Sequence, residues 1–487
     1  MKTTHFSGFD RRRFIQTIGA SALAGFPALG VEGANDKVRL GLIGCGGKGE
    51  AHLAYFSGLK NVEFVAISDA DTAHMAKGVK KLESQGQKTP VGQHQDYRDL
   101  LDRQDIDAVV IASPNHWHAL HCIHACQAGK DVYVEKPVTH KMSESAPMIA
   151  AAEKYDRIVQ AGTQNRSDTG LIDALDFIQS GEIGKITAVR GLCYRNRDSI
   201  GRAKNPPLKP PSTVDYNLWL GPALDLPLLR KRFHYDWHWI WNTGNGDIGN
   251  QAPHELDIIS WFLGDPGLPA QMNSFGQRFV WDDAGQSPNM QTLWFELGDV
   301  PVIFELNDLW IKPGTNAAPS YKGTRVGMIV TCEGGEFRGG RGGGNIFSLD
   351  GKNKIQKFPG DAGNGHAQNF IDAVRSRNSD GLHGKLARST QTAALSHLAN
   401  LSHRSGSPAT GKELREGALA SSPDLLEVLD RQEAQLDRWS VDTSKTPYIL
   451  GSDVTVDPST GKLSGELANS PLANPQYRKG FTLPEKA

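Results

Sequence analysis

The chain has 487 residues, of which 38% are hydrophobic and 22% charged, a composition typical of folded rather than disordered proteins. Its formal net charge of -1 gives no reason to expect a nucleic-acid-binding surface. The length allows two domains of ordinary size, each with its own core.

The N-terminal segment predicts export. Residues 10–16 (DRRRFIQ) resemble a twin-arginine motif, and a short apolar stretch follows at residues 17–31. Glycine and proline interrupt that stretch, so we expect no stable membrane insertion. We predict a signal peptide over residues 1–34 and a periplasmic or otherwise extracytoplasmic location. The alternative is a cytosolic protein with a basic tail.

The cysteines give little sign of a metal site. Cys122 and Cys126 lie four residues apart near three histidines, so they could place ligands on one helix face. No second ligand pair accompanies them, and the spacing of the five cysteines suggests no pairing. A buried helix is the favoured interpretation, and no metal is predicted.

The first part of the chain alternates short apolar runs with helical segments. Strands are expected at residues 38–43, 62–67, 108–112, 132–134 and 158–161, with helices at 51–56, 97–102, 118–128 and 143–155. Strands separated by helices at this spacing favour a parallel sheet. We therefore predict an α/β Rossmann domain over residues 35–162.

The pattern changes after Gly162. Longer strands are expected at residues 186–194, 271–280, 292–297, 302–306 and 326–332, with helices at 366–377 and 386–403. This predicts an α+β domain over residues 163–405 with an open, mostly antiparallel sheet, whose late helices can pack back on the first domain. The glycine-rich residues 334–344 are expected to form a turn or mobile loop. Residues 406–487 are predicted to be a C-terminal extension, irregular from about residue 441.

A dinucleotide site is predicted at residues 44–49 (GCGGKG), which follow a buried strand and open a helix. Gly44 permits the tight turn, Gly46 lets the backbone approach a pyrophosphate, and Gly49 allows close packing of the helix on the strand. Asp69 ends the second strand, where a carboxylate binds ribose hydroxyls and repels a 2′-phosphate. The pattern favours NAD over NADP. The alternative is a Rossmann fold that binds another nucleotide or none.

Three further segments, together with the glycine loop, closely resemble the Gfo/Idh/MocA oxidoreductases, over about residues 37–405. These segments are residues 109–118 (VVIASPNHWH), 131–137 (DVYVEKP) and 162–166 (GTQNR). The resemblance implies sugar or cyclitol substrates and a bound nicotinamide cofactor. It also implies further cofactor-binding residues, namely Ser113, Asn115, His118, Glu135, Lys136 and Gln164.

The same resemblance implies that Lys136 lies beside the reacting carbinol. A lysine ammonium can stabilise a developing alkoxide, and His254 is the natural general acid or base. Asn250 stands where the family usually has an aspartate, so it can bond a hydroxyl but cannot act as a base. The substrate-binding residues are predicted to be Asn165, Arg195, His234, Trp237, Asn250, His254 and Asp257. The aromatic run at residues 232–241 is either a carbohydrate-facing wall or a packed core.

The expected function combines these features with export. We predict an exported NAD(P)-dependent oxidoreductase that acts on a sugar, glycoside or polyol, with NAD tightly bound because little free cofactor exists outside the cytoplasm. One alternative is an NAD-dependent glycoside hydrolase that oxidises its substrate transiently, which differs from the two-carboxylate mechanism. A second alternative is a non-catalytic sugar or nucleotide sensor. A homodimer or homotetramer is expected, because the open sheet of this fold often packs against another subunit.

Overall fold

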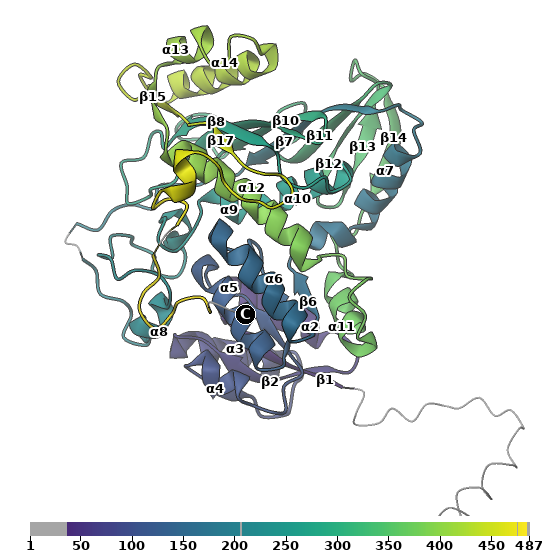
Figure 1. The fold of residues 1–487 in the computed structure, drawn as a ribbon, viewed down its shortest axis with the longest axis vertical. Coiled ribbons are helices and arrows are strands. Elements are labelled where there is room, and N and C mark those ends of the chain that lie inside the picture. Colours follow the sequence, from purple (N-terminus) through teal and green to yellow (C-terminus); the bar gives the residue numbers. More distant parts are fainter. Residues whose placement is uncertain (1–36, 205–206, 475, 485–487) are drawn as a thin grey trace, which may run out of the picture. The chain divides into compact units, whose positions relative to one another are not determined.

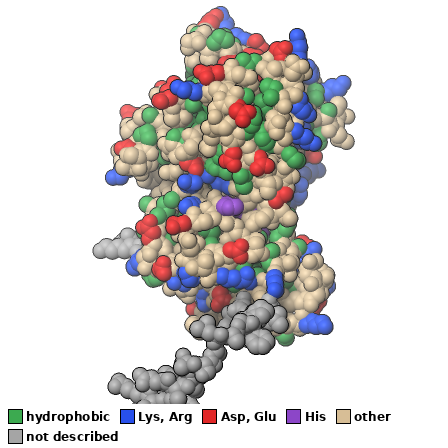
Figure 2. Space-filling model, turned by 90° about the vertical axis from the view of Figure 1, so that its right-hand side faces the viewer, with side chains coloured by type: hydrophobic (Ala, Val, Ile, Leu, Met, Phe, Trp, Pro, Cys, Tyr) green, Lys and Arg blue, Asp and Glu red, His purple; other side chains and the backbone are tan. Residues whose placement is uncertain are grey.

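The computed structural model describes residues 37–204, 207–474 and 476–484. The predicted signal peptide lies outside the described residues. In the described part, no helix is both long and apolar enough to cross a membrane. The face in Figure 2 carries Lys and Arg side chains interspersed with Asp and Glu.

The first domain contains a six-stranded sheet in the order β3-β2-β1-β4-β5-β6, with every neighbouring pair parallel. Its elements are β1 (Val38–Ile43), α2 (Gly47–Ser57), β2 (Val62–Ser68), α3 (Thr72–Ser84), β3 (Gly92–His94), α4 (Tyr97–Leu101), β4 (Ala108–Ile111), α5 (His118–Gln127), β5 (Asp131–Val134), α6 (Ser145–Lys154) and β6 (Val159–Ala161). The strand order reverses between β1 and β4, and such a point leaves a crevice at the carboxyl ends of the strands.

The second domain contains an 11-stranded sheet in the order β14-β13-β12-β11-β7-β10-β9-β8-β16-β15, with β17 paired to β8. Its strands are β7 (Ile186–Tyr194), β8 (Gln271–Gln277), β9 (Met290–Leu297), β10 (Val300–Asn307), β11 (Val326–Cys332), β12 (Gly335–Gly340), β13 (Gly343–Phe347), β14 (Lys354–Pro359), β15 (Ser407–Ala409), β16 (Tyr448–Leu450) and β17 (Val454–Thr455). The pair β7–β10 is parallel, and the other pairs are antiparallel. The predicted fold class is confirmed.

The expectation of a turn or mobile loop at residues 334–344 is wrong. These residues form most of the hairpin β12–β13, in which Gly339 pairs with Gly344. A Cβ atom on either glycine would lie 2.4 to 2.6 Å from the Phe337 ring. The glycines therefore make room for a buried aromatic ring beneath the strands.

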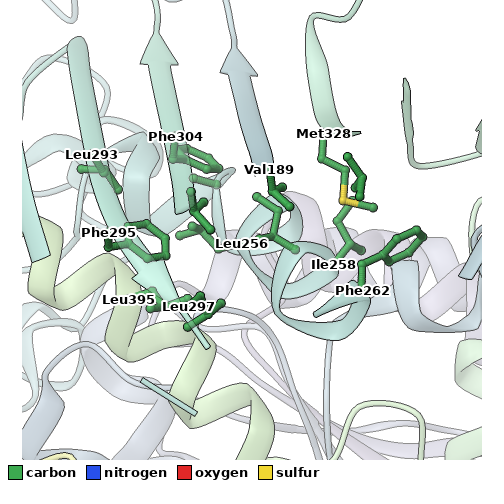
Figure 3. Packing of buried hydrophobic residues seen from close by; sticks show 14 of the residues in the cluster. Val189, Leu256, Ile258, Phe262, Leu293, Phe295, Leu297, Phe304, Met328 and Leu395 are labelled. Atoms are coloured by element: carbon green, nitrogen blue, oxygen red, sulfur yellow. The ribbon is translucent and has the colours of Figure 1, made fainter. Parts of the chain in front are cut away.

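Helices cover both faces of the large sheet (Figure 1). On one face lie α7 (Thr169–Gln179), α9 (Asp247–Asn250), α10 (Pro253–Phe262) and α12 (Leu386–Arg404), and on the other α13 (Gly411–Glu416) and α14 (Pro423–Arg438). Figure 3 shows how the first of these faces packs against its helices: Val189 and Phe304 of the sheet pack with Leu256 of α10. α8 (Tyr216–Leu220) lies in the long connection between β7 and α9.

Late elements of the chain complete both domains. Phe370 and Ile371 of α11 (His366–Ser376) belong to the core that includes β1 and β2 of the Rossmann domain. Within the predicted extension, β15, β16 and β17 join the large sheet, and α14 contributes Val428 and Leu429 to its second core. The chain thus passes back to the first domain at α11, after most strands of the second domain. This connectivity links the two domains more than once.

Candidate functional site

A cavity of about 410 Å³ lies at the carboxyl ends of β1, β2, β4 and β5. The start of α10 and the long connection before α9 form its other walls. It brings together most of the predicted site residues from both domains. These are Gly44, Gly46, Asp69, Ser113, Asn115, His118, Glu135, Lys136, His234, Trp237, Asn250 and His254.

The glycine loop is shaped as the sequence predicts. Gly44 has φ +93°, and a Cβ atom there would lie 2.6 Å from the Ser113 amide nitrogen. A Cβ atom on Gly49 would lie 1.9 Å from the Gly44 oxygen, whereas one on Gly46 meets nothing closer than 3.6 Å. Gly46 also caps α2 without a side-chain hydrogen bond, so the first amides of the helix remain available to an anion.

Asp69 follows the end of β2 and lines the cavity. Its carboxylate accepts hydrogen bonds from the Cys45 amide at 2.7 Å and the Asp71 amide at 2.8 Å. The carboxylate is therefore fixed in position beside the glycine loop. The adjacent His74 ring lies 3.4 Å from Asp69 Oδ2, and this hydrogen bond raises the pKa of His74.

Glu135 is buried at the centre of a polar cluster beneath the cavity. Its Oε1 lies 2.8 Å from His52 Nε2 and 3.3 Å from Lys48 Nζ. Burial alone would raise the pKa of Glu135, but Lys48 and the His52 hydrogen bond bring it well below its ordinary value. Glu135 therefore holds a negative charge there. Neither Lys48 nor His52 was predicted from the sequence, although Lys48 stands inside the glycine motif.

Lys136 reaches from the first domain to the second. Its Nζ donates a 2.5 Å hydrogen bond to the backbone oxygen of Asn250. Burial lowers the pKa of Lys136, while the neighbouring Glu135 opposes that effect. An ammonium with a lowered pKa can both donate and give up a proton more readily than an exposed lysine.

His254 lies at the first turn of α10 and lines the same cavity as Lys136. Burial and the charge of Lys136 lower the pKa of His254 well below its ordinary value, so the ring is neutral at physiological pH. Its Nδ1 is buried without a hydrogen-bond partner, which leaves Nε2 as the ring nitrogen that can reach a substrate. A neutral imidazole beside a lysine is a suitable proton acceptor.

Glu255 is a residue that the sequence analysis did not single out. Its side chain is buried, with Oε1 near the Gln251 amide at 3.3 Å and Oε2 without a partner. Burial raises the pKa of Glu255 to about 8. A carboxyl group that favours its protonated form thus lies directly after His254 in the chain, outside the lining of the cavity, and no motif in the sequence indicated it.

Asn250 is positioned by an ion pair behind it. Its Nδ2 donates to Asp247 Oδ1 at 2.8 Å, and Arg197 Nε donates to Asp247 Oδ2 at 2.6 Å. Asp247 is fully buried. Burial would raise the pKa of Asp247, but Arg197 lowers it. Arg197 is thereby engaged with Asp247, and its guanidinium supports the site from behind.

Five predicted site residues do not line this cavity. Gly49 lies under the loop, and Gln164 donates to Glu135 at 3.0 Å behind the cavity wall. Asn165 is buried, and Arg195 lines a second cavity. Asp257 faces inward, where its two oxygens accept from Arg166 at 2.8 Å and Thr392 at 3.1 Å, so its carboxylate is not placed for substrate contact.

The aromatic run at residues 232–241 contributes both to the wall of the cavity and to hydrophobic cores. Trp237 and the exposed Tyr235 line the cavity, whereas Trp239 packs in a small separate core. His234 Nε2 lies 2.8 Å from Asp71 Oδ2, and the His234 and His74 rings are 4.1 Å apart. This cluster of Asp71, His74 and His234 was not predicted.

The residues around Cys122 and Cys126 are engaged in hydrogen bonds. His121 contacts the Ser113 hydroxyl at 3.1 Å, and His124 contacts the Tyr97 hydroxyl at 2.8 Å. His118 is held between two backbone oxygens at 2.7 Å each, so its ring braces the cavity floor. Within the described residues, the group with metal-ligand geometry is Asp71, His74 and His234 rather than this helix.

Comparison with known proteins finds matches to family models in parts of both domains. Residues 38–163 match the Gfo/Idh/MocA model described as an oxidoreductase family with an NAD-binding Rossmann fold. Residues 182–285 match the model of that family's C-terminal alpha/beta domain.

Two curated relatives are named glycosyl hydrolase family 109 proteins. The protein from Shewanella pealeana is 34% identical over 173 residues, which is 30% of this chain and 38% of that protein. Protein 2 from Shewanella sp. strain ANA-3 is 36% identical over 176 residues, 31% of this chain and 38% of that protein. The match thus spans well under half of each relative.

Two solved structures share the fold at low sequence identity. Levoglucosan dehydrogenase, solved with NADH and levoglucosan, has a TM-score of 0.56 and 18% identity over 74% of this chain and 96% of that one. The WlbA dehydrogenase from Bordetella pertussis, solved with NADH and UDP-GlcNAcA, has a TM-score of 0.52 and 18% identity over 74% and 94%.

Proposed function

Since residues 38–163 and 182–285 match the models of the two Gfo/Idh/MocA oxidoreductase domains, we propose that the chain is an NAD(P)-dependent oxidoreductase acting on a carbinol carbon of a sugar, glycoside or polyol. The observation that carries this proposal is the convergence of Lys136 and His254 on the cavity that also holds the glycine loop. A donor and a proton acceptor from different domains meet where a cofactor and a substrate can lie together.

The residues present fit a dinucleotide. Gly46 and Gly47 leave the space beside the first turn of α2 free of side chains, as a pyrophosphate requires. Asp69 is fixed beside that space and can accept hydrogen bonds from ribose hydroxyls. The Asp69 carboxylate favours binding of NAD over binding of NADP, because it would repel a 2′-phosphate.

The chain's own groups supply the proton chemistry. A bound nicotinamide would accept or return the hydride at the carbinol carbon. Lys136 Nζ donates a hydrogen bond to the reacting oxygen and stabilises negative charge on it. His254 Nε2, being neutral, accepts the hydroxyl proton, and the walls at Trp237 and His234 limit the entry of water.

A second candidate is a redox-neutral glycoside hydrolase, favoured by the names of the curated relatives. Transient oxidation of the carbinol two carbons from the anomeric carbon would acidify the C–H bond between them and allow the aglycone to leave by elimination. Water would then add to the double bond before the ketone is reduced again. The same Lys136 and His254 would serve both reactions. The difference lies in whether the hydride returns to the substrate within one cycle.

One assay separates these functions. The purified protein is incubated with a panel of sugars and p-nitrophenyl glycosides while nicotinamide absorbance and nitrophenol release are recorded together. A change in absorbance without release supports the oxidoreductase. Release without a net change in absorbance supports the hydrolase. Saturable sugar binding with neither signal would overturn both and favour a sensor.

We further propose export by the twin-arginine route, based on residues 10–16, with the cofactor bound before transport. Fractionation of cells that express the full chain tests this. Protein found in the periplasm only when residues 11 and 12 are intact supports export, and equal cytosolic retention of both forms contradicts it.

A further inference from the structure

A second cavity, of about 490 Å³, lies at one end of the large sheet. Strand ends meet there, because β7 and β11 are antiparallel neighbours and the turn between β12 and β13 lies on the same side. Arg195 follows β7, Arg325 precedes β11, Arg341 sits in the turn, and Lys357 comes from β14. The sheet topology therefore gathers four basic residues that are far apart in the sequence.

These basic groups are not neutralised by neighbours. Across the described ranges, no carboxylate oxygen lies within 4.0 Å of the charged groups of Arg195, Arg325, Arg341 or Lys357. Arg325 contacts the Asn196 side chain at 3.3 Å, and Arg341 Nε donates to the Ala362 oxygen at 3.3 Å. Both contacts orient a guanidinium without cancelling its charge.

Other arginines of this region are paired, which makes the contrast specific. Arg338 lines the same cavity but donates to Glu336 at 2.7 Å, and Arg197 donates to Asp247 at 2.6 Å. A single basic residue on a protein surface is common. Four basic residues around one cavity, without a carboxylate partner among the described residues, create a local positive potential. Such a cavity can bind an anion.

The basic cavity is linked to the candidate active site through the segment that follows β14. Arg341 Nε donates to the Ala362 oxygen at 3.3 Å, and a Cβ atom on the neighbouring Gly363 would lie 2.0 Å from the Gln164 oxygen. Gln164 in turn donates to Glu135 at 3.0 Å, and Glu135 lines the candidate active site. The turn that carries Arg341 is also anchored by the Gly342 amide, which donates to Asp168 at 2.7 Å. The basic turn is therefore attached to residues that lie directly behind the wall of the candidate active site.

We propose that the basic cavity is a substrate subsite that binds an anionic group, so the substrate is an acidic sugar or glycoside bearing a carboxylate, sulfate or phosphate. This rests on the proposed function, because it assumes that a sugar ring occupies the space between Lys136 and His254. Arginine pairs with all three anions through planar, two-point hydrogen bonds.

The test measures binding rather than turnover. NAD-loaded protein is titrated calorimetrically with D-glucose, D-glucuronate, D-glucose 6-sulfate and D-glucose 6-phosphate at low salt. At least one acidic sugar should bind about tenfold or more tightly than glucose, a difference of about 1.4 kcal/mol. The preference should shrink as salt is raised, because exposed charges are screened. The three acidic sugars distinguish which anion the cavity takes.

Matched variants locate the effect. Arg195→Gln and Arg341→Gln should each reduce the preference by several-fold, and Lys357→Gln should do so more weakly. Lys354→Gln is the control, because Lys354 lies on the same strand but its Nζ stands over the Phe347 ring. Thermal unfolding of each variant shows whether the fold is kept.

Each outcome has a defined meaning. Equal binding of glucose and all acidic sugars, or no saturable binding of any acidic sugar, overturns the proposal. A change in oligomeric state by light scattering in the arginine variants, with an unchanged sugar preference, would make the cavity a contact between subunits and also overturn it. Acidic-sugar binding without hydride transfer or glycoside cleavage would instead refute the proposed function and leave the subsite intact.

Discussion

Lys136 Nζ donates a hydrogen bond to the backbone oxygen of Asn250, which joins the loop after β5 of the Rossmann domain to the short helix α9 of the second domain. Both residues line the cavity that His254 also lines. Because the acceptor is a backbone atom, substitution of the Asn250 side chain leaves it in place.

Replacing Lys136 tests the chemistry directly. Lys136→Met should lower the chemical rate by about a hundredfold or more, in line with the loss of an acid–base group. NAD should still bind, because the glycine loop is untouched. Single-turnover rates and NAD titration are the measurements. Lys154→Met, at the exposed end of α6, is the control, and an equal loss in both variants would contradict the assignment.

His254→Ala should reduce the rate to a similar degree, and Asn250→Ala should reduce it less. His254 offers a ring nitrogen to the substrate, whereas the Asn250 side chain acts mainly through its 2.8 Å contact with Asp247. The pH–rate profile is the informative measurement, because loss of a titrating base alters its shape. An unchanged profile in His254→Ala would exclude His254 as the base.

Asp69→Asn should narrow the preference for NAD over NADP. The amide removes the negative charge that repels a 2′-phosphate and keeps an acceptor for one of the two backbone amides, Cys45 and Asp71, that donate to Asp69. Fluorescence titration with each reduced cofactor gives the ratio of dissociation constants. Tighter binding of NADP than NAD by the unaltered protein would show that this reading of Asp69 is mistaken.

Cofactor retention should depend on His234. This residue links the long connection before α9 to Asp71 of the first domain by a 2.8 Å hydrogen bond. The purified protein should release nicotinamide cofactor on acid treatment, and His234→Ala should release NAD faster in stopped-flow displacement. His238→Ala, whose ring bonds the Tyr235 oxygen within the same segment, is the comparison. Protein that contains no nucleotide would contradict tight binding.

Glu255 should make stability depend on pH. Burial raises the pKa of Glu255 to about 8 in the folded chain, above its ordinary value in the unfolded chain. The folded state therefore holds a proton that the unfolded state has lost, and stability falls as pH rises from about 4.5 to about 8. Glu255→Gln should weaken this decline when unfolding free energies are compared across that range. Identical pH dependence in both proteins would mean that Glu255 is ionised in the fold.

Much of the fold and of the cofactor site follows from local sequence. The cofactor site lies within about 30 residues, which include the glycine loop, its flanking strand and helix, and Asp69. Its geometry therefore depends mainly on residues that are close together in the sequence. Lys136 was instead assigned through the family resemblance of residues 131–137, which include a buried strand and the loop after it. The late helices were also predicted, since their hydrophobic periodicity marks them.

The tertiary structure decided what local patterns could not. Residues 334–344 form a hairpin in which Gly339 and Gly344 pair with each other, and the Phe337 ring fills the space that their Cβ atoms would occupy. That packing joins two strands and is not visible in the local pattern. Asp257 resembles a substrate ligand in sequence but is paired with Arg166, 91 residues away. Arg195 and Arg197 look alike in sequence, yet only Arg197 meets a carboxylate among the described residues. Charge pairing and burial depend on neighbours that the sheet brings together. They show which polar residues are already paired within the protein and which are available to bind a ligand.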